Sequence, residues 1–196
     1  MQKSRSERPG GFSLCVAGIP GVGKSRLIAE YIAAKPNDQH VPGSGVVKGL
    51  IAPATVEDFD RWPEAKRTEI REAAIQKLRD MRAACPGRLL VDGHFILRNR
   101  VTSELEPVFT PGDRAFYDAL VLIEAPAEQI SRWREADSRR RRPESVEEIR
   151  IHQDAERMEA ERIAQKMGVQ LTIIDDPELT VRARALGRFL DQMCPL

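Results

Sequence analysis

Residues 18–25 read Gly-Ile-Pro-Gly-Val-Gly-Lys-Ser and match the pattern G-x-x-x-x-G-K-[ST]. Glycines in such a loop let several backbone N–H groups turn toward one anion, and the following helix adds the positive end of its dipole. In this motif the lysine reaches the β- and γ-phosphates of a nucleotide and the hydroxyl ligates Mg²⁺. The predicted ATP-binding residues are Gly18, Gly21, Val22, Gly23, Lys24, Ser25 and Arg26, and Lys24 is also predicted to be catalytic.

Both flanks of this loop suit phosphate binding. Residues 12–17 are an apolar run typical of a buried strand, and the apolar residues among 26–32 have helical spacing. The motif requires a strand before it and a helix after it. The alternative is a glycine-rich connection that binds nothing. The complete pattern with both flanks favours a site for ATP and Mg²⁺.

A carboxylate supplies the second chemical candidate. Asp92 ends the apolar run 88–92, where an acid beside a phosphate-binding loop holds Mg²⁺ directly or through water. We therefore predict a metal site of Ser25 and Asp92, with Asp92 also counted as catalytic. The alternative is a solvated aspartate at the end of a strand. Glu124 ends a later apolar run in the same way, and we expect a structural role for it.

Residues 139–142 are four consecutive arginines. Three interpretations are open: a solvated helix end, a patch that binds RNA, and a lid that folds over bound phosphates. Arginines that close over a phosphoryl group stabilise the charge on its oxygens during transfer, whereas RNA-binding patches usually interleave aromatic side chains that this run lacks. We favour a short lid spanning about 132–145. The lone residues His94 and His152 are expected to make structural hydrogen bonds.

Strands and helices alternate along the chain, which favours a parallel sheet covered by helices on both faces. The predicted strands are 12–17, 39–41, 88–92, 119–125 and 169–174. The predicted helices are 24–34, 46–51, 63–84, one that opens at Pro126, 145–167, and one that opens at Pro177 after an Asp176 cap. The expected fold is an α/β three-layer sandwich with a five-stranded parallel sheet.

Three finer predictions concern the connections. Residues 42–45 are expected to be a tight loop, and residues 99–116 a functional or partly mobile loop, because they show little periodicity. In the helix 63–84, one apolar stripe is predicted to face the core; it consists of Ile70, Ala74, Leu78 and Met81.

The composition limits the classes of function. A chain of 196 residues fits one domain, predicted at 12–196 after a flexible tail at 1–11. Thirty-one basic and thirty acidic residues give a net charge of +1, which argues against binding nucleic acid or a membrane surface through overall charge. No apolar run approaches the ~20 residues of a membrane span. The three scattered cysteines predict reduced thiols and a cytoplasmic setting, and a homo-oligomer is compatible with this composition.

Several segments together resemble one family. Residues 18–25 are similar to the loop of archaeal-type adenylate kinases, whose usual form ends in Thr. Residues 92–98, Asp-Gly-His-Phe-Ile-Leu-Arg, resemble that family's Asp-Thr-His segment with a basic residue six positions after the Asp, and Gly93 replaces the Thr. Residues 123–125 and 139–153 are similar to its lid and following helix. The order and spacing of the segments carry the resemblance, which is good over about 12–30 and 88–175 and poor over 35–87.

The resemblance implies a P-loop NTPase fold and the activity of a nucleoside monophosphate kinase. ATP with Mg²⁺ would bind the phosphate loop, and the lid arginines Arg139 and Arg141 would be catalytic. The acceptor, with AMP as the first candidate, would bind to a segment of about 38–87 and to four further residues: Ser44, Lys48, His94 and Arg98. The partners implied are thus two small nucleotides.

This sequence departs from the family on the acceptor side. Lys48 stands where an arginine is usual, which loses bidentate geometry, and 99–116 lacks the expected Gly- and Pro-rich segment. Two alternatives therefore stay open. One is a kinase of another small metabolite, and the other is an ATPase switch or assembly factor, because relatives of the family include ATPases tied to ribosome assembly.

Overall fold

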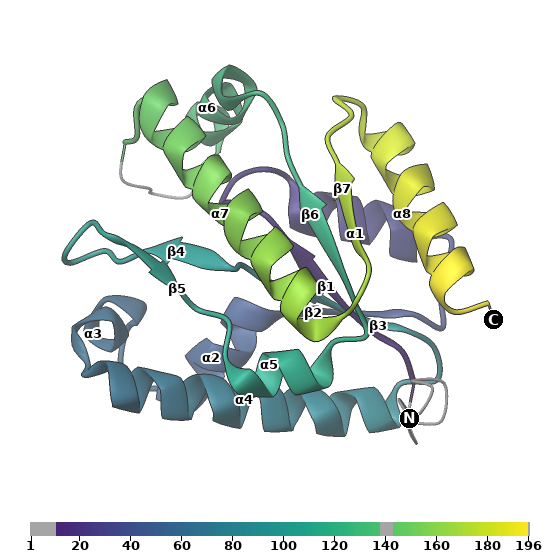
Figure 1. Ribbon diagram of the computed structural model, residues 1–196, viewed down its shortest axis with the longest axis horizontal. Helices are drawn as coiled ribbons and strands as arrows, with labels where there is room; N and C mark the ends of the chain where they lie inside the picture. The colour runs from purple at the N-terminus through teal and green to yellow at the C-terminus, as the bar shows by residue number, and fades with distance from the viewer. Residues whose placement is uncertain (1–10, 138–142, 196) are drawn as a thin grey trace.

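The computed structural model describes residues 11–137 and 143–195 of the chain. Within these ranges, five parallel strands form the main sheet in the order β2-β3-β1-β6-β7 (Figure 1). Their bounds are β1 (Ser13–Ala17), β2 (Gln39–Pro42), β3 (Leu89–Asp92), β6 (Ala119–Ile123) and β7 (Leu171–Ile174). The predicted five-stranded parallel sheet is confirmed.

Eight helices and a small antiparallel hairpin complete the described part of the chain. The helices are α1 (Lys24–Ile32), α2 (Gly43–Ile51), α3 (Val56–Arg61), α4 (Glu64–Ala84), α5 (Pro111–Phe116), α6 (Ala127–Ala136), α7 (Val146–Met167) and α8 (Leu179–Met193). The hairpin pairs β4 (Ile96–Arg98) with β5 (Leu105–Pro107). The predicted tail, apart from Gly11, and the arginine run 139–142 lie outside the described residues.

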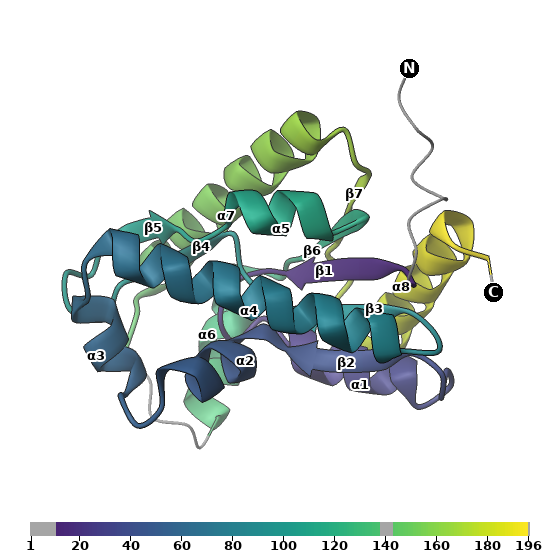
Figure 2. The same ribbon diagram turned by 90° about the horizontal axis from the view of Figure 1, so that it is seen from below.

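Side chains alternate between the two faces of the sheet along each strand. Helices cover both faces, so the sheet is buried on both sides. In β1, Leu14 and Val16 pack in the core beneath α1 and α8, while Cys15 and Ala17 pack in a second core with α4, α5 and α7. Figure 2 shows the sheet between α5 and α7 on one side and α1 on the other. This is the expected three-layer arrangement, and it brings the carboxyl ends of β1 and β3 side by side.

The prediction of a loop over 99–116 is wrong. This segment contains β5 and α5, and α5 begins with a capping box in which the side chains of Thr110 and Asp113 bond to each other's backbone N–H groups. Pro111 at the first helical position adds to this start signal. A six-residue helix is too short to display a helical period, so its caps were the only local evidence for it.

Other boundaries also differ. The predicted tight loop 42–45 belongs mostly to α2, which starts at Gly43, and α3 was not predicted although a Thr55–Asp58 capping box opens it. In α4 the core side is formed by Ala74, Ile75 and Leu78, while Met81 is exposed. The last helix starts at Leu179 rather than at residue 177, and the Asp176 side chain accepts from the N–H of Glu178 before the helix begins.

The buried side chain of Arg88 connects the helices α1 and α8. The side chain of Arg88 is 1% exposed and donates to the Tyr31 hydroxyl on α1 (2.9 Å) and to Asp191 on α8 (3.0 Å). Its guanidinium lies 3.6 Å from the fully buried carboxylate of Asp38, which also accepts from the Arg88 N–H. Asp38 would thus be a buried charge without its cation if this side chain were removed.

We expect Arg88→Met to lower the free energy of unfolding by about 3 kcal/mol, because Asp38 would keep its charge in an apolar setting. The matched control is Lys35→Met, which removes an exposed cation 3.7 Å from Asp191 and should cost less than about 1 kcal/mol. Urea unfolding followed by circular dichroism measures both variants. Equal losses in the two would contradict a special role for the buried cluster.

Candidate functional site

The loop after β1 has the backbone of an anion cradle. Gly18 has a φ of 142°, and a Cβ placed there would lie 2.5 Å from the carbonyl oxygen of Ile123. Gly23, with a φ of 96°, directly precedes the first turn of α1. Only glycine adopts the first of these conformations in so little space, and it lets the chain turn from strand to helix within a few residues. The first N–H groups of α1 are thereby presented at the sheet edge.

The side chain of Lys24 folds back along the loop. Its ammonium donates to the carbonyl oxygens of Gly18 (2.6 Å) and Ile19 (3.3 Å), and it lies 3.8 Å from a carboxylate oxygen of Asp92. The residue is buried, with 6% of its surface exposed. The loop carbonyls therefore hold a positive charge at the centre of the loop.

The two predicted metal ligands, Ser25 and Asp92, lie in direct contact. The Ser25 hydroxyl donates to Asp92 Oδ2 at 2.5 Å, and Nε2 of His40 lies 3.9 Å from the same oxygen. A hydroxyl and a carboxylate are hard oxygen donors, and Mg²⁺ in proteins commonly takes one or two of these together with phosphate oxygens. The residues present therefore fit Mg²⁺ bound with a nucleotide. No group of three or more His, Cys, Asp or Glu suited to a metal occurs within 11–137 and 143–195.

A cleft of about 700 Å³ opens along this loop. The predicted residues that line it are Gly21, Val22, Gly23, Lys24, Ser25, Arg26, Ser44, Asp92 and His94. Burial lowers the pKa of His94 well below its ordinary value, as does the charge of Lys24, while a hydrogen bond with the backbone of Gly18 acts in the opposite sense. At neutral pH His94 is therefore an uncharged group at the cleft wall.

Two predicted acceptor residues lie elsewhere. Lys48 is exposed on α2 and does not line the cleft. Arg98, at the end of β4, donates through Nε to Glu144 (2.7 Å) and through Nη1 to the carbonyl of Ser103 (2.7 Å). The same Glu144 carboxylate accepts from Arg134. The predicted acceptor arginine is thus already held by a carboxylate at the border of the predicted lid.

Two arginines that the sequence patterns did not reveal support the loop, the half-buried Arg134 and the buried Arg182. On α6, Arg134 donates through Nε and Nη2 to the carbonyl oxygen of Pro20, at 2.9 and 2.5 Å. On α8, Arg182 donates to the carbonyls of Val22 (3.1 Å) and Glu124 (2.6 Å), and its guanidinium lies 5.7 Å from the ring centroid of Trp133. The contact of Arg134 with Pro20 spans 114 residues, that of Arg182 with Val22 spans 160 and that of Arg182 with Glu124 spans 58, so no local sequence pattern indicates them.

The residues expected to be structural make such contacts. Glu124 forms a two-point ion pair with Arg157 on α7. The buried ring of His152 bonds through Nε2 to the carbonyl of Ile96 at 3.2 Å. All three cysteines are free thiols. No helix in the described ranges is long and apolar enough to span a membrane.

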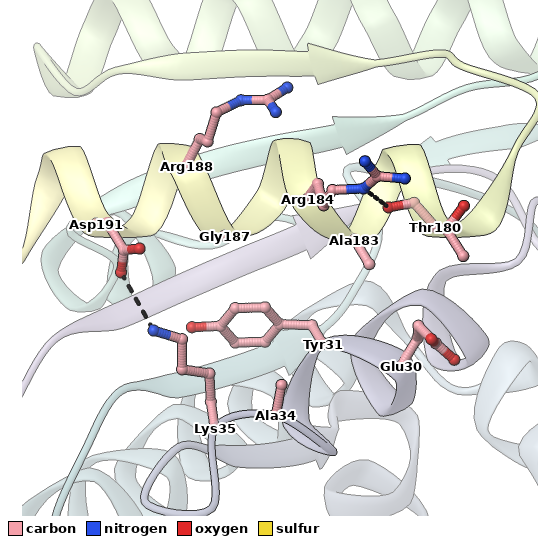
Figure 3. A pocket seen from close by; sticks show the side chains of 10 residues that line it. All are labelled: Glu30, Tyr31, Ala34, Lys35, Thr180, Ala183, Arg184, Gly187, Arg188 and Asp191. Carbon is pink, nitrogen blue, oxygen red and sulfur yellow. Dashed lines mark hydrogen bonds and ion pairs between the residues drawn. The ribbon is translucent and has the colours of Figure 1, made fainter.

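A second hollow of about 600 Å³ lies between α1 and α8 (Figure 3). Its polar contacts include the pair of Lys35 with Asp191 and a bond from Arg184 to the carbonyl of Thr180. The first contact links the segment after α1 to α8, and the second lies within α8. An ammonium, a hydroxyl and a carboxylate instead meet at the phosphate loop, which is therefore the candidate site.

Comparisons with known proteins agree with this geometry. The family model described as "AAA domain" matches residues 17–150. The adenylate kinase of Methanopyrus kandleri is 26% identical over 184 residues, which cover 85% of this chain and 90% of the relative. The adenylate kinase of Methanothermobacter thermautotrophicus is 27% identical over 173 residues, covering 81% and 87%.

Among solved structures, shikimate kinase from Bacteroides thetaiotaomicron shares the fold, with a TM-score of 0.56 and 16% identity over 92% of this chain and 98% of that one. The family match includes the phosphate loop from Gly18, Asp92 and the start of α7. The chain therefore belongs to the P-loop kinase family that this AAA-domain model describes, and archaeal adenylate kinases are among the proteins to which it is similar.

Proposed function

We propose that the protein transfers the γ-phosphoryl group of ATP to a nucleoside monophosphate, with AMP as the first candidate. The observation that carries this proposal is the meeting of Lys24, Ser25 and Asp92 at the mouth of one cleft. The similarity to two archaeal adenylate kinases supports the choice of acceptor. Phosphoryl transfer between nucleotides depends on positioning and charge neutralisation, and this constellation supplies both.

On the donor side, the amides from Gly21 to Ser25 would bind the phosphates, and Lys24 would exchange its loop carbonyls for phosphate oxygens. Ser25 and Asp92 would hold Mg²⁺, which when bound neutralises charge on the phosphates. Arg134 binds the carbonyl oxygen of Pro20 and Arg182 binds that of Val22, both in the phosphate loop. The loop is thus braced before any ligand arrives, so that little reorganisation remains to be done on binding.

On the acceptor side, Arg98 would bind the phosphate of the monophosphate, with Ser44, Lys48 and His94 as further contacts. Because the acceptor phosphate is an anion, it would compete with Glu144 for this guanidinium. Arg139 and Arg141 are proposed as the lid arginines that stabilise the transferring group. The lid at about 132–145 and the acceptor segment at about 38–87 form part of one domain in this proposal.

A kinase with a hydroxyl acceptor is the second candidate. Asp92 lines the cleft, and its carboxylate could accept the proton of an attacking hydroxyl. Nε2 of His40 lies 3.9 Å from this carboxylate. Transfer to a monophosphate needs no such base, because the acceptor is already ionised. The two candidates thus differ in the acceptor that supports turnover.

A panel of acceptors tests the proposed function. ADP formation from ATP and Mg²⁺ should be fastest with AMP, with a kcat/KM at least ~10-fold above the values for GMP, CMP and UMP, since a site that hydrogen-bonds one base leaves polar groups unpaired when another base binds. Sugars and hydroxy acids should give no turnover. Turnover with a hydroxyl acceptor alone would favour the second candidate. Slow hydrolysis independent of every acceptor would favour an ATPase switch.

Paired arginine variants test the acceptor site. Arg98→Ala should raise KM for the monophosphate by about 10- to 100-fold, the expected loss for a charge-assisted contact, and leave KM for ATP within about twofold. Arg100→Ala is the matched control, because Arg100 is exposed and pairs with Asp60 near the same hairpin. Steady-state kinetics with each substrate varied would measure both. An equal effect of the two variants, or a change confined to ATP, would contradict the role of Arg98.

A further inference from the structure

A buried carboxylate lies behind the phosphate loop and has no part in the proposed transfer. Glu156 on α7 is 1% exposed. Its Oε1 accepts from the N–H of Gly18 (3.2 Å) and of Phe95 (3.0 Å), and its Oε2 accepts from the N–H of Ile96 (2.5 Å). One side chain thus binds three backbone amides from two segments that are far apart in the sequence.

Those two segments carry the proposed donor site. Gly18 is the first residue of the phosphate loop, and Phe95 and Ile96 follow Asp92 and His94 into β4. In Figure 1, α7 crosses the sheet close to β6 and β4. The N–H of Gly18 bonds to α7, and its carbonyl accepts from Lys24. The entry of the loop is therefore held from both sides, by a carboxylate behind it and an ammonium in front.

A carboxylate suits this place better than its neutral isostere. Three amides converge on two oxygens, and a glutamine would offer one oxygen and an NH₂ group that faces an N–H. The Lys24 ammonium on α1 lowers the pKa of Glu156, and the charge of Glu156 in turn helps to raise the pKa of the neutral Cys15 thiol on β1. Burial raises the pKa of Glu156 to about 7, although the amides of Phe95, Ile96 and Gly18 and the charge of Lys24 lower it.

We propose that Glu156 is a positioning residue for nucleotide binding, which fixes the entry of the phosphate loop to the segment after Asp92 while Lys24 leaves Gly18 for the phosphates. The inference rests on the proposed binding of ATP with Mg²⁺ at the loop. It assigns to Glu156 no contact with the nucleotide. The bond that Lys24 gives up is compensated by the phosphates, and the bonds of Gly18 and Phe95 to Oε1 persist even when Oε2 carries a proton.

Because Glu156 lies directly behind the phosphate loop, nucleotide binding should change its protonation, which a carboxylate remote from the loop would not show. A polyphosphate arriving on the other side of the loop is a like charge, which disfavours the ionised carboxylate further. Glu156, partly ionised at pH 7.5, therefore takes up a proton when the nucleotide binds. Linkage then requires that affinity for the nucleotide fall as the pH rises from 7 toward 8.5.

Calorimetry of the full-length protein tests the proposal. A non-hydrolysable ATP analogue with Mg²⁺ is titrated at pH 7.5 in buffers of different ionisation enthalpy, which gives the protons taken up. Wild type should take up on the order of half a proton more than Glu156→Gln, and the variant should bind about 10-fold more weakly, because the entry of its loop is held less firmly before the nucleotide arrives. Asp113→Asn is the matched control: it alters a partly buried carboxyl whose pKa desolvation raises to about 6 but which caps α5. It should match wild type.

The outcomes separate the inference from the function on which it rests. Wild type that binds no nucleotide refutes the proposed function. Wild type that binds with no dependence on the buffer, or Glu156→Gln with unchanged affinity and proton uptake, overturns the role of Glu156. If Glu156→Gln does not fold, Glu156→Asp carries the test: it keeps the acid but shortens its reach, so proton uptake should remain while affinity falls. An aspartate variant with wild-type affinity would contradict positioning.

Discussion

The contact on which the rest of the structure depends is that between the carboxylate of Asp92 and the first turn of α1. The Ser25 hydroxyl donates to it and the Lys24 ammonium lies 3.8 Å away. This contact is possible because β3 pairs directly with β1, with Asp92 opposite Val16, so the two strands end together. Ligand sites of open parallel sheets form at such carboxyl edges because the loops that follow neighbouring strands converge there.

The helices around the sheet hold this edge in place through charged side chains. Arg134 from α6, Arg182 from α8 and Glu156 from α7 bond to backbone groups of the phosphate loop from three directions. Arg182 and Glu156 satisfy a carbonyl of Val22 and an amide of Gly18, and both of these loop residues are buried. Because a desolvated charge is costly when its partner moves, such contacts favour a single conformation of the loop. A braced loop is what electrostatic stabilisation of transfer requires.

Local patterns were sufficient for the sheet, the phosphate loop and Asp92, because a strand, a glycine turn and a strand-end acid are each encoded by neighbouring residues. The contacts of Arg134, Arg182 and Glu156 with the phosphate loop were not predictable in this way, since each spans more than 100 residues and exists only after the helices pack. The helix α5 was missed for another reason: six residues are too few to show a period, although Thr110 and Asp113 marked its start. The acceptor residues stay a prediction. Lys48 lies away from the cleft and Arg98 is held by Glu144, and no local pattern indicates either fact.

The most direct test of the account is a crystal structure with a non-hydrolysable ATP analogue and Mg²⁺. The account predicts the β- and γ-phosphates within hydrogen-bonding distance of the amides between Gly21 and Ser25, Lys24 turned from the Gly18 carbonyl onto them, and the metal beside Ser25 and Asp92. A nucleotide bound elsewhere, such as between α1 and α8, or loop amides that face away from its phosphates, would contradict it.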